Sequence, residues 1–200
     1  DNNFDTAWLM DDDGYPDKNA YKILKKAFRE DTACISSVVI NEADKSKFVF
    51  PFPLLNKSQM PKIGFKKNKI ISVTKFNSFC KNNLYPWVHL FNGALISINS
   101  VKKIGNVNKD YFLYGDDNDF FFRLRKSGKV LSHSKALHFH PAVANTHFSK
   151  IKFFYLLRNS IINIRKYYNL IFLRCLLWIP YILFVLYKRN DIKSLFSILI

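Results

Sequence analysis

A short apolar run, residues 6–10, leads directly into three consecutive aspartates, Asp11, Asp12 and Asp13, and then into Gly14. An apolar run that ends in polar residues indicates a buried strand stopping at the edge of a sheet. Alternate side chains of a strand point the same way, so we expect Asp11 and Asp13 to face one site. Neighbouring carboxylates repel one another, and a bound cation relieves that repulsion. The triplet therefore predicts a divalent-metal site, with a metal-free turn rich in Asp and Gly as the alternative.

A second acidic cluster, Asp116, Asp117, Asn118 and Asp119, lies about a hundred residues further along the chain. It leads into residues 119–126, whose aromatic and aliphatic spacing predicts a helix. Asp116 or Asp119 can cap this helix, which leaves Asp117 for chemistry. A carboxylate near like charges in a partly dry site has a raised pKa and becomes a better base. The cluster therefore predicts either a general base at Asp117 or helix capping alone.

Strand and helix patterns fill much of the remaining chain. Residues 20–28 have the apolar spacing of a helix, with Asp17 as the expected N-cap. Residues 34–40 are rich in β-branched side chains, which is typical of a strand. The sequence of residues 41–86 predicts a long, partly extended loop, in which residues 70–73 are the best strand candidate. Further elements are expected in this order: a helix capped by Ser100 at 101–104, a helix at 119–126, strands at 130–131 and 136–139, and a helix at 151–168.

Two histidines, His138 and His140, flank Phe139 in one of the expected strands, so they would face the same side. Imidazole is a common ligand of transition metals, and one of the two can complete a site with the carboxylates. Simple filling of the core or surface is the alternative. His133 and His147 lie nearby and leave an independent zinc site open, whereas the three widely spaced cysteines indicate neither a zinc ribbon nor a disulfide scaffold.

The chain is strongly basic, with 31 Lys and Arg residues against 15 Asp and Glu residues and a formal net charge of +16. Residues 151–200 contain eight basic residues and one acidic residue, and these basic side chains lie among aliphatic and aromatic ones. This mixture indicates an anionic membrane surface rather than nucleic acid, for which no recognisable motif is present. Residues 170–187 approach the roughly 20 residues of a spanning helix, but Arg174 and Pro180 interrupt them, so an interfacial hairpin is favoured over a span.

Five motifs follow one another along the chain: WLMDDDG at residues 8–14, FNGALIS at 91–97, FLYGDDNDF at 112–120 with Arg123, HFHP at 138–141, and YLLRN at 155–159. Together they resemble the family 2 glycosyltransferases, which are metal-dependent inverting enzymes with the GT-A fold. The resemblance is greatest to the galactofuranosyl- and rhamnosyltransferase-like branch, which builds bacterial cell-surface polysaccharides. It implies an α/β, Rossmann-like fold followed by apolar C-terminal helices.

The resemblance implies roles for individual residues. Asp11 and Asp13 would hold Mn²⁺ or Mg²⁺ on the diphosphate of a nucleotide-sugar donor, with His138 or His140 as a third ligand. Asp117 matches the catalytic base of the family, which takes a proton from an acceptor hydroxyl as its oxygen attacks the anomeric carbon from the opposite face. The donor- and acceptor-binding residues would include Asp12, Trp87, Phe91, Asn92, Gly93, Asp116 and Arg123.

The resemblance also implies a domain organisation and a location. Residues 1–150 would form the catalytic portion, and residues 151–200 a basic, apolar tail at the cytoplasmic face of the cell membrane, near a glycan or lipid-linked acceptor. The N-terminal nucleotide-binding part of the family would precede Asp1, so we expect the chain alone to be inactive. UDP-galactofuranose and dTDP-rhamnose are the expected donors. A membrane-anchored binding or scaffold protein without catalysis is the alternative.

Overall fold

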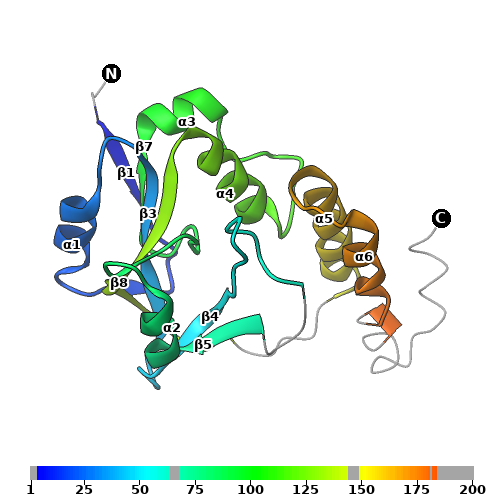
Figure 1. Ribbon diagram of the computed structural model, residues 1–200, viewed down its shortest axis with the longest axis horizontal. Helices are drawn as coiled ribbons and strands as arrows, with labels where there is room; N and C mark the ends of the chain where they lie inside the picture. The colour runs from blue at the N-terminus through cyan, green and yellow to red at the C-terminus, as the bar shows by residue number, and fades with distance from the viewer. Residues whose placement is uncertain (1–3, 64–67, 144–148, 181, 184–200) are drawn as a thin grey trace. The chain divides into compact units, whose positions relative to one another are not determined.

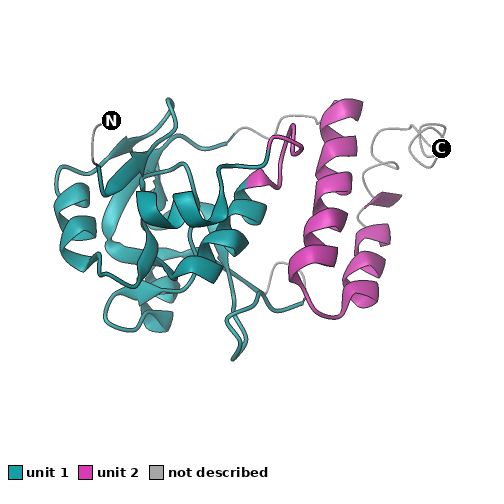
Figure 2. Cartoon of the chain, turned by 90° about the horizontal axis from the view of Figure 1, so that it is seen from above, with its two compact units in different colours: residues 1–108, 117–146 teal, residues 109–116, 147–200 magenta. Residues whose placement is uncertain are grey.

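The computed structural model describes residues 4–63, 68–143, 149–180 and 182–183. The chain divides into two compact units (Figure 2). The first comprises Asp1–Asn108 and Asp117–Thr146, and the second comprises Lys109–Asp116 and His147–Ile200. The second unit therefore includes a segment from the middle of the chain, which the predicted tail at 151–200 did not contain.

The first unit is built around a mixed β-sheet (Figure 1). Its strands have the order β1-β7-β3-β4-β5, and β8 pairs with β3 as well as with the short strands β2 and β6. β3 and β8 run parallel, and every residue of β3 except Asn41 is buried, as is typical of a parallel strand covered on both faces. The strands are β1 Thr6–Leu9, β2 Tyr15–Pro16, β3 Thr32–Asn41, β4 Lys47–Pro53, β5 Lys69–Ser72, β6 Leu84–Tyr85, β7 Ala94–Ser97 and β8 Lys129–His140.

Helix α1 packs against the sheet through one apolar face. Its buried Leu24 forms a core cluster with Ile35 of β3, Leu95 of β7 and Ala136 of β8. Burying a leucine side chain contributes about 1.5–3 kcal/mol, so these contacts hold α1 against the strand pair β3 and β8. The helices that accompany the sheet are α1 Ala20–Ala27, α2 Val73–Phe79, α3 Ile98–Ile104 and α4 Asp116–Ser127.

Two predicted helix caps are wrong by a few residues. The N-cap of α1 is Asn19, while Asp17 accepts a hydrogen bond from the Asn19 backbone N–H at 2.8 Å in the turn before the helix. The N-cap of α3 is Ser97, whose Oγ accepts from the Ser100 backbone N–H at 3.2 Å. A cap residue needs a non-helical backbone, and Ser97, at the end of β7, is extended, whereas Ser100 already lies within the helix.

The loop predicted over residues 41–86 contains more regular structure than expected. β4 and α2 both form in it, and their aromatic side chains Phe48, Phe52 and Phe76 are buried against one another. The two strands predicted at 130–131 and 136–139 are one strand, β8. A register shift opposite Ser37 and Val38 absorbs the polar residues that interrupt the apolar pattern, which is why the sequence suggested two pieces.

The described C-terminal residues form two helices, α5 Lys150–Tyr167 and α6 Ile171–Leu176. The helix predicted at 151–168 is confirmed, and Ser149 caps it. None of the helices in the described ranges has both the length and the apolarity needed to cross a membrane. Of the apolar run at 170–187, residues 181 and 184–187 lie outside the described residues.

Candidate active site

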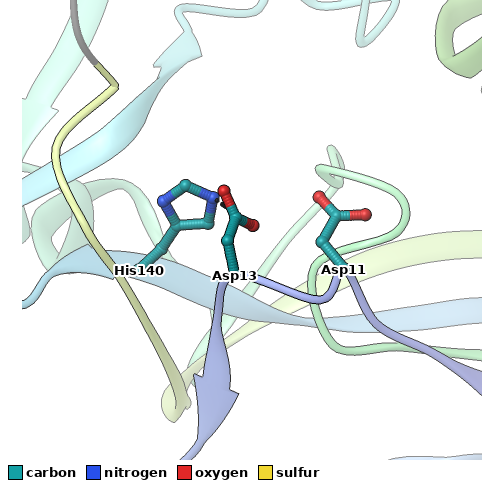
Figure 3. Close-up of side chains that lie close together, drawn as sticks. All are labelled: Asp11, Asp13 and His140. Carbon is teal, nitrogen blue, oxygen red and sulfur yellow. Dashed lines mark ion pairs between the residues drawn. The ribbon is translucent and has the colours of Figure 1, made fainter.

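The structure brings Asp11, Asp13 and His140 together at one end of the sheet (Figure 3). Asp11 and Asp13 follow the end of β1, and His140 is the last residue of β8. The short strand β2 comes directly after the aspartates and pairs with β8 at Phe139 and His138, which anchors the triplet beside His140. One ligand atom from each of the three side chains lies within 4.8 Å of the others, so the group can hold a metal ion.

The hydrogen bonds of His140 are compatible with a bound cation at this position. Its Nδ1 lies 2.6 Å from the Pro141 carbonyl oxygen, which can only accept, so Nδ1 carries the proton. Its Nε2 lies 3.0 Å from Asp13 Oδ1. A neutral His140 would therefore direct a lone pair at a carboxylate, an arrangement that is stable when a proton or a cation lies between the two atoms. Nδ1–H donation to a carbonyl is also the usual way in which a metal-binding histidine is oriented.

The two aspartates lie in a locally acidic environment within a basic chain. Partial burial raises the pKa of Asp11, a hydrogen bond from Asn92 opposes that rise, and the charge of Asp13 adds to it. Asn92 Nδ2 donates to Asp11 Oδ2 at 2.9 Å. In the described part of the chain, no Lys or Arg forms an ion pair with either aspartate. Their charges are thus uncompensated except by His140, which suits a divalent cation with oxygen and imidazole ligands.

His138 faces the same region as His140 but is not in the metal-binding group. It is fully buried, and neither ring nitrogen has a hydrogen-bond partner among the described residues. It occupies the space left by two glycines: a Cβ on Gly14 would lie 2.3 Å from Nε2, and one on Gly93 would lie 3.2 Å from Nδ1. The sequence allowed either histidine as the third ligand, and of the two only His140 lies in the group that could hold a metal ion. No second metal-binding group of this kind occurs in the described ranges, and His147 lies outside them.

The segment around Asn92 is held so that its amide reaches Asp11. Phe91 and Gly93 both have positive φ angles, 70° and 82°. The Gly93 N–H donates to the Leu9 carbonyl at 2.9 Å, and the Gly93 carbonyl accepts from the Ser37 N–H at 3.0 Å. These bonds connect the turn to β1 and β3, and thereby place Asn92 beside the acidic triplet.

Trp87 and Asp12, which were also predicted to bind donor or acceptor, do not belong to the metal-binding group. Trp87 is buried and packs on Phe121 with ring centroids 4.2 Å apart, and its carbonyl accepts from Ser132 Oγ at 2.6 Å. Its observed contacts are therefore those of a core residue. Asp12 is exposed beside the metal-binding group without belonging to it.

In the second acidic cluster, the structure separates a buried, ion-paired aspartate from an exposed one. Asp119 is 1% exposed and pairs with Arg123, whose Nε lies 2.8 Å from Asp119 Oδ2. Arg123 also donates to the carbonyls of Ile104 and Gly105, so it ties α4 to the end of α3. Asp117 is exposed in the first turn of α4, where its Oδ1 accepts from the backbone N–H of Asn118.

The loop that precedes Asp117 is fixed by two asparagines of α5 that sequence reasoning gave no role. Asn159 Nδ2 donates to the carbonyls of Leu113 and Tyr114, both at 2.7 Å, and Asn163 Nδ2 donates to the Gly115 carbonyl at 2.8 Å. Both asparagines are buried. The signal that could have identified them is a pair of amides four residues apart on the core side of an amphipathic helix, since buried amides need partners.

Comparison with known proteins finds similarity to a curated sequence relative and to a solved structure. No protein-family model matches the chain. Galactofuranosyltransferase GlfT1 of Mycolicibacterium smegmatis is 29% identical over 128 residues, which are 62% of this chain and 39% of that protein. The chain thus spans about two fifths of the length of this relative. A crystal structure of GalNAc-T7 with UDP, GalNAc and Mn²⁺ matches 84% of this chain and 32% of its own, with a TM-score of 0.54 and 13% identity.

The structural match and the sequence match support different conclusions. At 13% identity, the structural match establishes the fold, the mixed α/β fold of GT-A glycosyltransferases. The sequence similarity relates this chain to part of a galactofuranosyltransferase. The neighbour contains Mn²⁺, and this chain has a group of two aspartates and a histidine that can hold a metal, which is consistent with a divalent cation at Asp11, Asp13 and His140.

Proposed function

We propose that the chain carries the metal-binding and proton-accepting parts of an inverting glycosyltransferase of the family 2 type. It transfers a sugar from a nucleotide-sugar donor to a hydroxyl group of a growing cell-surface glycan or a lipid-linked acceptor. The observation that carries this proposal is the group formed by Asp11, Asp13 and His140, in which the Nε2 atom of His140 faces a carboxylate 3.0 Å away.

The residues of this group have distinct tasks in the proposed reaction. Asp11, Asp13 and His140 hold Mn²⁺ or Mg²⁺, which when bound supplies positive charge to the departing nucleoside diphosphate. The Pro141 carbonyl keeps the proton of His140 on Nδ1, so that Nε2 is free to bind. The amide of Asn92 orients Asp11.

Asp117 is the general base of the proposed mechanism. It accepts the proton of the acceptor hydroxyl as the oxygen forms its bond to the anomeric carbon, while the bond to the diphosphate breaks on the opposite face. General-base assistance of this kind is worth about 10² to 10⁴ in rate. Asn159 and Asn163 act as positioning residues, because they hold the loop that precedes Asp117.

The proposed donor is UDP-galactofuranose, in view of the activity named for the GlfT1 relative, with dTDP-rhamnose as the second candidate. We also propose that the protein works at the cytoplasmic face of the membrane. Support comes from α6, which contains no buried residue and whose Phe172 is 77% exposed, close to Arg174. Apolar and basic side chains on one short helix suit an anionic membrane surface.

Metal binding tests the proposal. Titration calorimetry of the chain with Mn²⁺ should detect binding that Asp13→Asn removes, because this change takes away a ligand charge. Asp12→Asn is the matched control: it removes an equal charge from an adjacent residue outside the group, whose charge acts on Asp11, and should lower Mn²⁺ affinity far less than Asp13→Asn does. Equal Mn²⁺ affinity in Asp13→Asn and the unmodified chain would contradict the site and favour a scaffold protein.

A further inference from the structure

A second concave site lies near the beginning of the β3 and β8 strands. The pocket has a volume of about 550 Å³, within the range of small-molecule sites. Thr32 and Lys129, which begin β3 and β8 as paired residues, line it. Asn41 and His140 are paired at the other end of the same strands. Nine residue steps along a strand correspond to about 30 Å, so this pocket is separate from the metal-binding group.

The rim of the pocket is cationic. Four basic side chains, Lys26, Arg29, Lys129 and Lys135, line it together with one acidic side chain, Asp31, which gives a formal charge of +3. Asp31 is already paired with Lys129 at 2.6 Å. Neither Lys26 nor Lys135 forms an ion pair with any residue in the described ranges. Two ammonium groups therefore remain available to a ligand.

The C-terminal end of helix α1, which lies at the pocket, does not repel an anion. The last carbonyls of α1 carry partial negative charge, which would repel one. Arg29 Nη1 donates to the Lys26 carbonyl at 2.6 Å and to the Phe28 carbonyl at 3.3 Å, and so compensates that charge. His133 offers a neutral donor: its Nδ1 accepts from the Lys135 N–H, which leaves the proton of the neutral ring on Nε2.

The floor of the pocket is apolar and its edge is a tight turn. Ile23, Ala27, Leu84 and Leu131 line the floor and pack against the main core. Asn82 and Asn83 at the edge both have positive φ angles, 51° and 64°, between the bridge partners Lys81 and Leu84, as in a type I′ turn. An apolar floor under a basic rim suits a ligand that combines an anionic group with an apolar body.

We propose that this pocket binds a phosphate ester, with the phosphate at Lys26 and Lys135 and the organic part on the apolar floor. The shared chemistry is a phosphomonoester, carried either by a soluble molecule or by a lipid headgroup. The site is independent of the metal and of the proposed sugar transfer.

Binding of phenyl phosphate in metal-free buffer tests the soluble source. Titration calorimetry should show that Lys26→Ala/Lys135→Ala raises the dissociation constant about tenfold or more, as expected for the loss of two charges. The control Lys102→Ala/Lys103→Ala, on exposed residues of α3, removes the same charge and should leave binding unchanged. Cosedimentation with phosphatidylcholine vesicles, with and without phosphatidic acid, tests the lipid source with the same variants.

The two assays separate the sources and can refute the proposal. A loss confined to the Lys26→Ala/Lys135→Ala variant in calorimetry identifies a soluble phosphate ester, and the same loss in cosedimentation identifies a lipid headgroup. Equal binding by this variant and the control in both assays would overturn the proposal. Binding of uncharged phenol as tight as that of phenyl phosphate would also overturn it. Because no metal is present, failure here leaves the glycosyltransferase proposal unaffected.

Discussion

The two acidic clusters look alike in sequence but are stabilised differently. At Asp11 and Asp13, no Lys or Arg of the described residues is paired with the carboxylates, and a histidine from a distant strand approaches them. In the cluster at 116–119, Asp119 is buried against Arg123, and the preceding loop is fixed by α5. The first cluster thus has negative charge that a bound cation would neutralise. In the second cluster, Asp119 stabilises the helix and Asp117 remains exposed.

This difference supports our proposal that the two clusters serve separate steps of one reaction. Carboxylates without a Lys or Arg partner can bind a divalent cation and the diphosphate that it carries. A single exposed carboxylate at the start of a helix can approach an acceptor and accept its proton. Changes in one cluster should therefore affect a property that changes in the other do not.

The largest expected effect comes from Asp117→Asn. Sugar transfer by the full-length polypeptide that contains this chain should fall by about 10² to 10⁴, because the amide cannot accept the proton. Transfer is measured with labelled UDP-galactofuranose and dTDP-rhamnose. Mn²⁺ affinity of the same variant is the control and should not change. Undiminished turnover would show that Asp117 is not the base and that the two clusters do not divide the reaction as proposed.

A smaller effect, confined to the first cluster, is expected for His140→Ala. Mn²⁺ affinity should fall about 10-fold to 100-fold or more, since even changes in residues that orient metal ligands have effects of this size. His133→Ala, elsewhere on β8, removes the same side chain away from the group and serves as the control. If both variants bind Mn²⁺ as the unmodified chain does, the two aspartates do not need the histidine.

The smallest effect is expected for Asn159→Ala, which tests the support of the second cluster. The change leaves the carbonyls of Leu113 and Tyr114 without their buried donor, so the free energy of unfolding should fall by about 1–3 kcal/mol. Urea denaturation measures it, and Ser160→Ala, the adjacent partly exposed residue, should change it by much less. Mn²⁺ affinity should be unaltered. A drop in Mn²⁺ affinity would indicate that the two clusters are coupled.

Much of the first cluster could be predicted because its chemistry is local. A strand that ends in alternating carboxylates predicts a metal site, although β1 is only partly buried, and the two histidines flanking Phe139 are candidates for a further ligand. The choice between His138 and His140 was not predictable, because both face the same side of β8. It depends on the absence of side chains at Gly14 and Gly93, which lets His138 pack under the site.

The second cluster was predictable only in part. Asp117 was identified by elimination among possible caps, but the pairing of Asp119 with Arg123 and the role of Asn159 depend on packing. The phosphate-ester pocket was not foreseen either, because its basic residues come from α1, β8 and the segments beside them, and are spread among the many other lysines of the chain.

Sequence alone is sufficient to identify which side chains can bind a cation, accept a proton or favour an anionic surface, because these abilities belong to residue types and to short patterns along one element. Sequence alone is also sufficient to predict most helices and strands, because their periodicity is local. Only the tertiary structure decides which of these side chains meet. His140 reaches Asp13 because β2 pairs with the end of β8, and that pairing is long-range. Metal coordination depends on distances of a few ångströms, which no local pattern in the chain encodes.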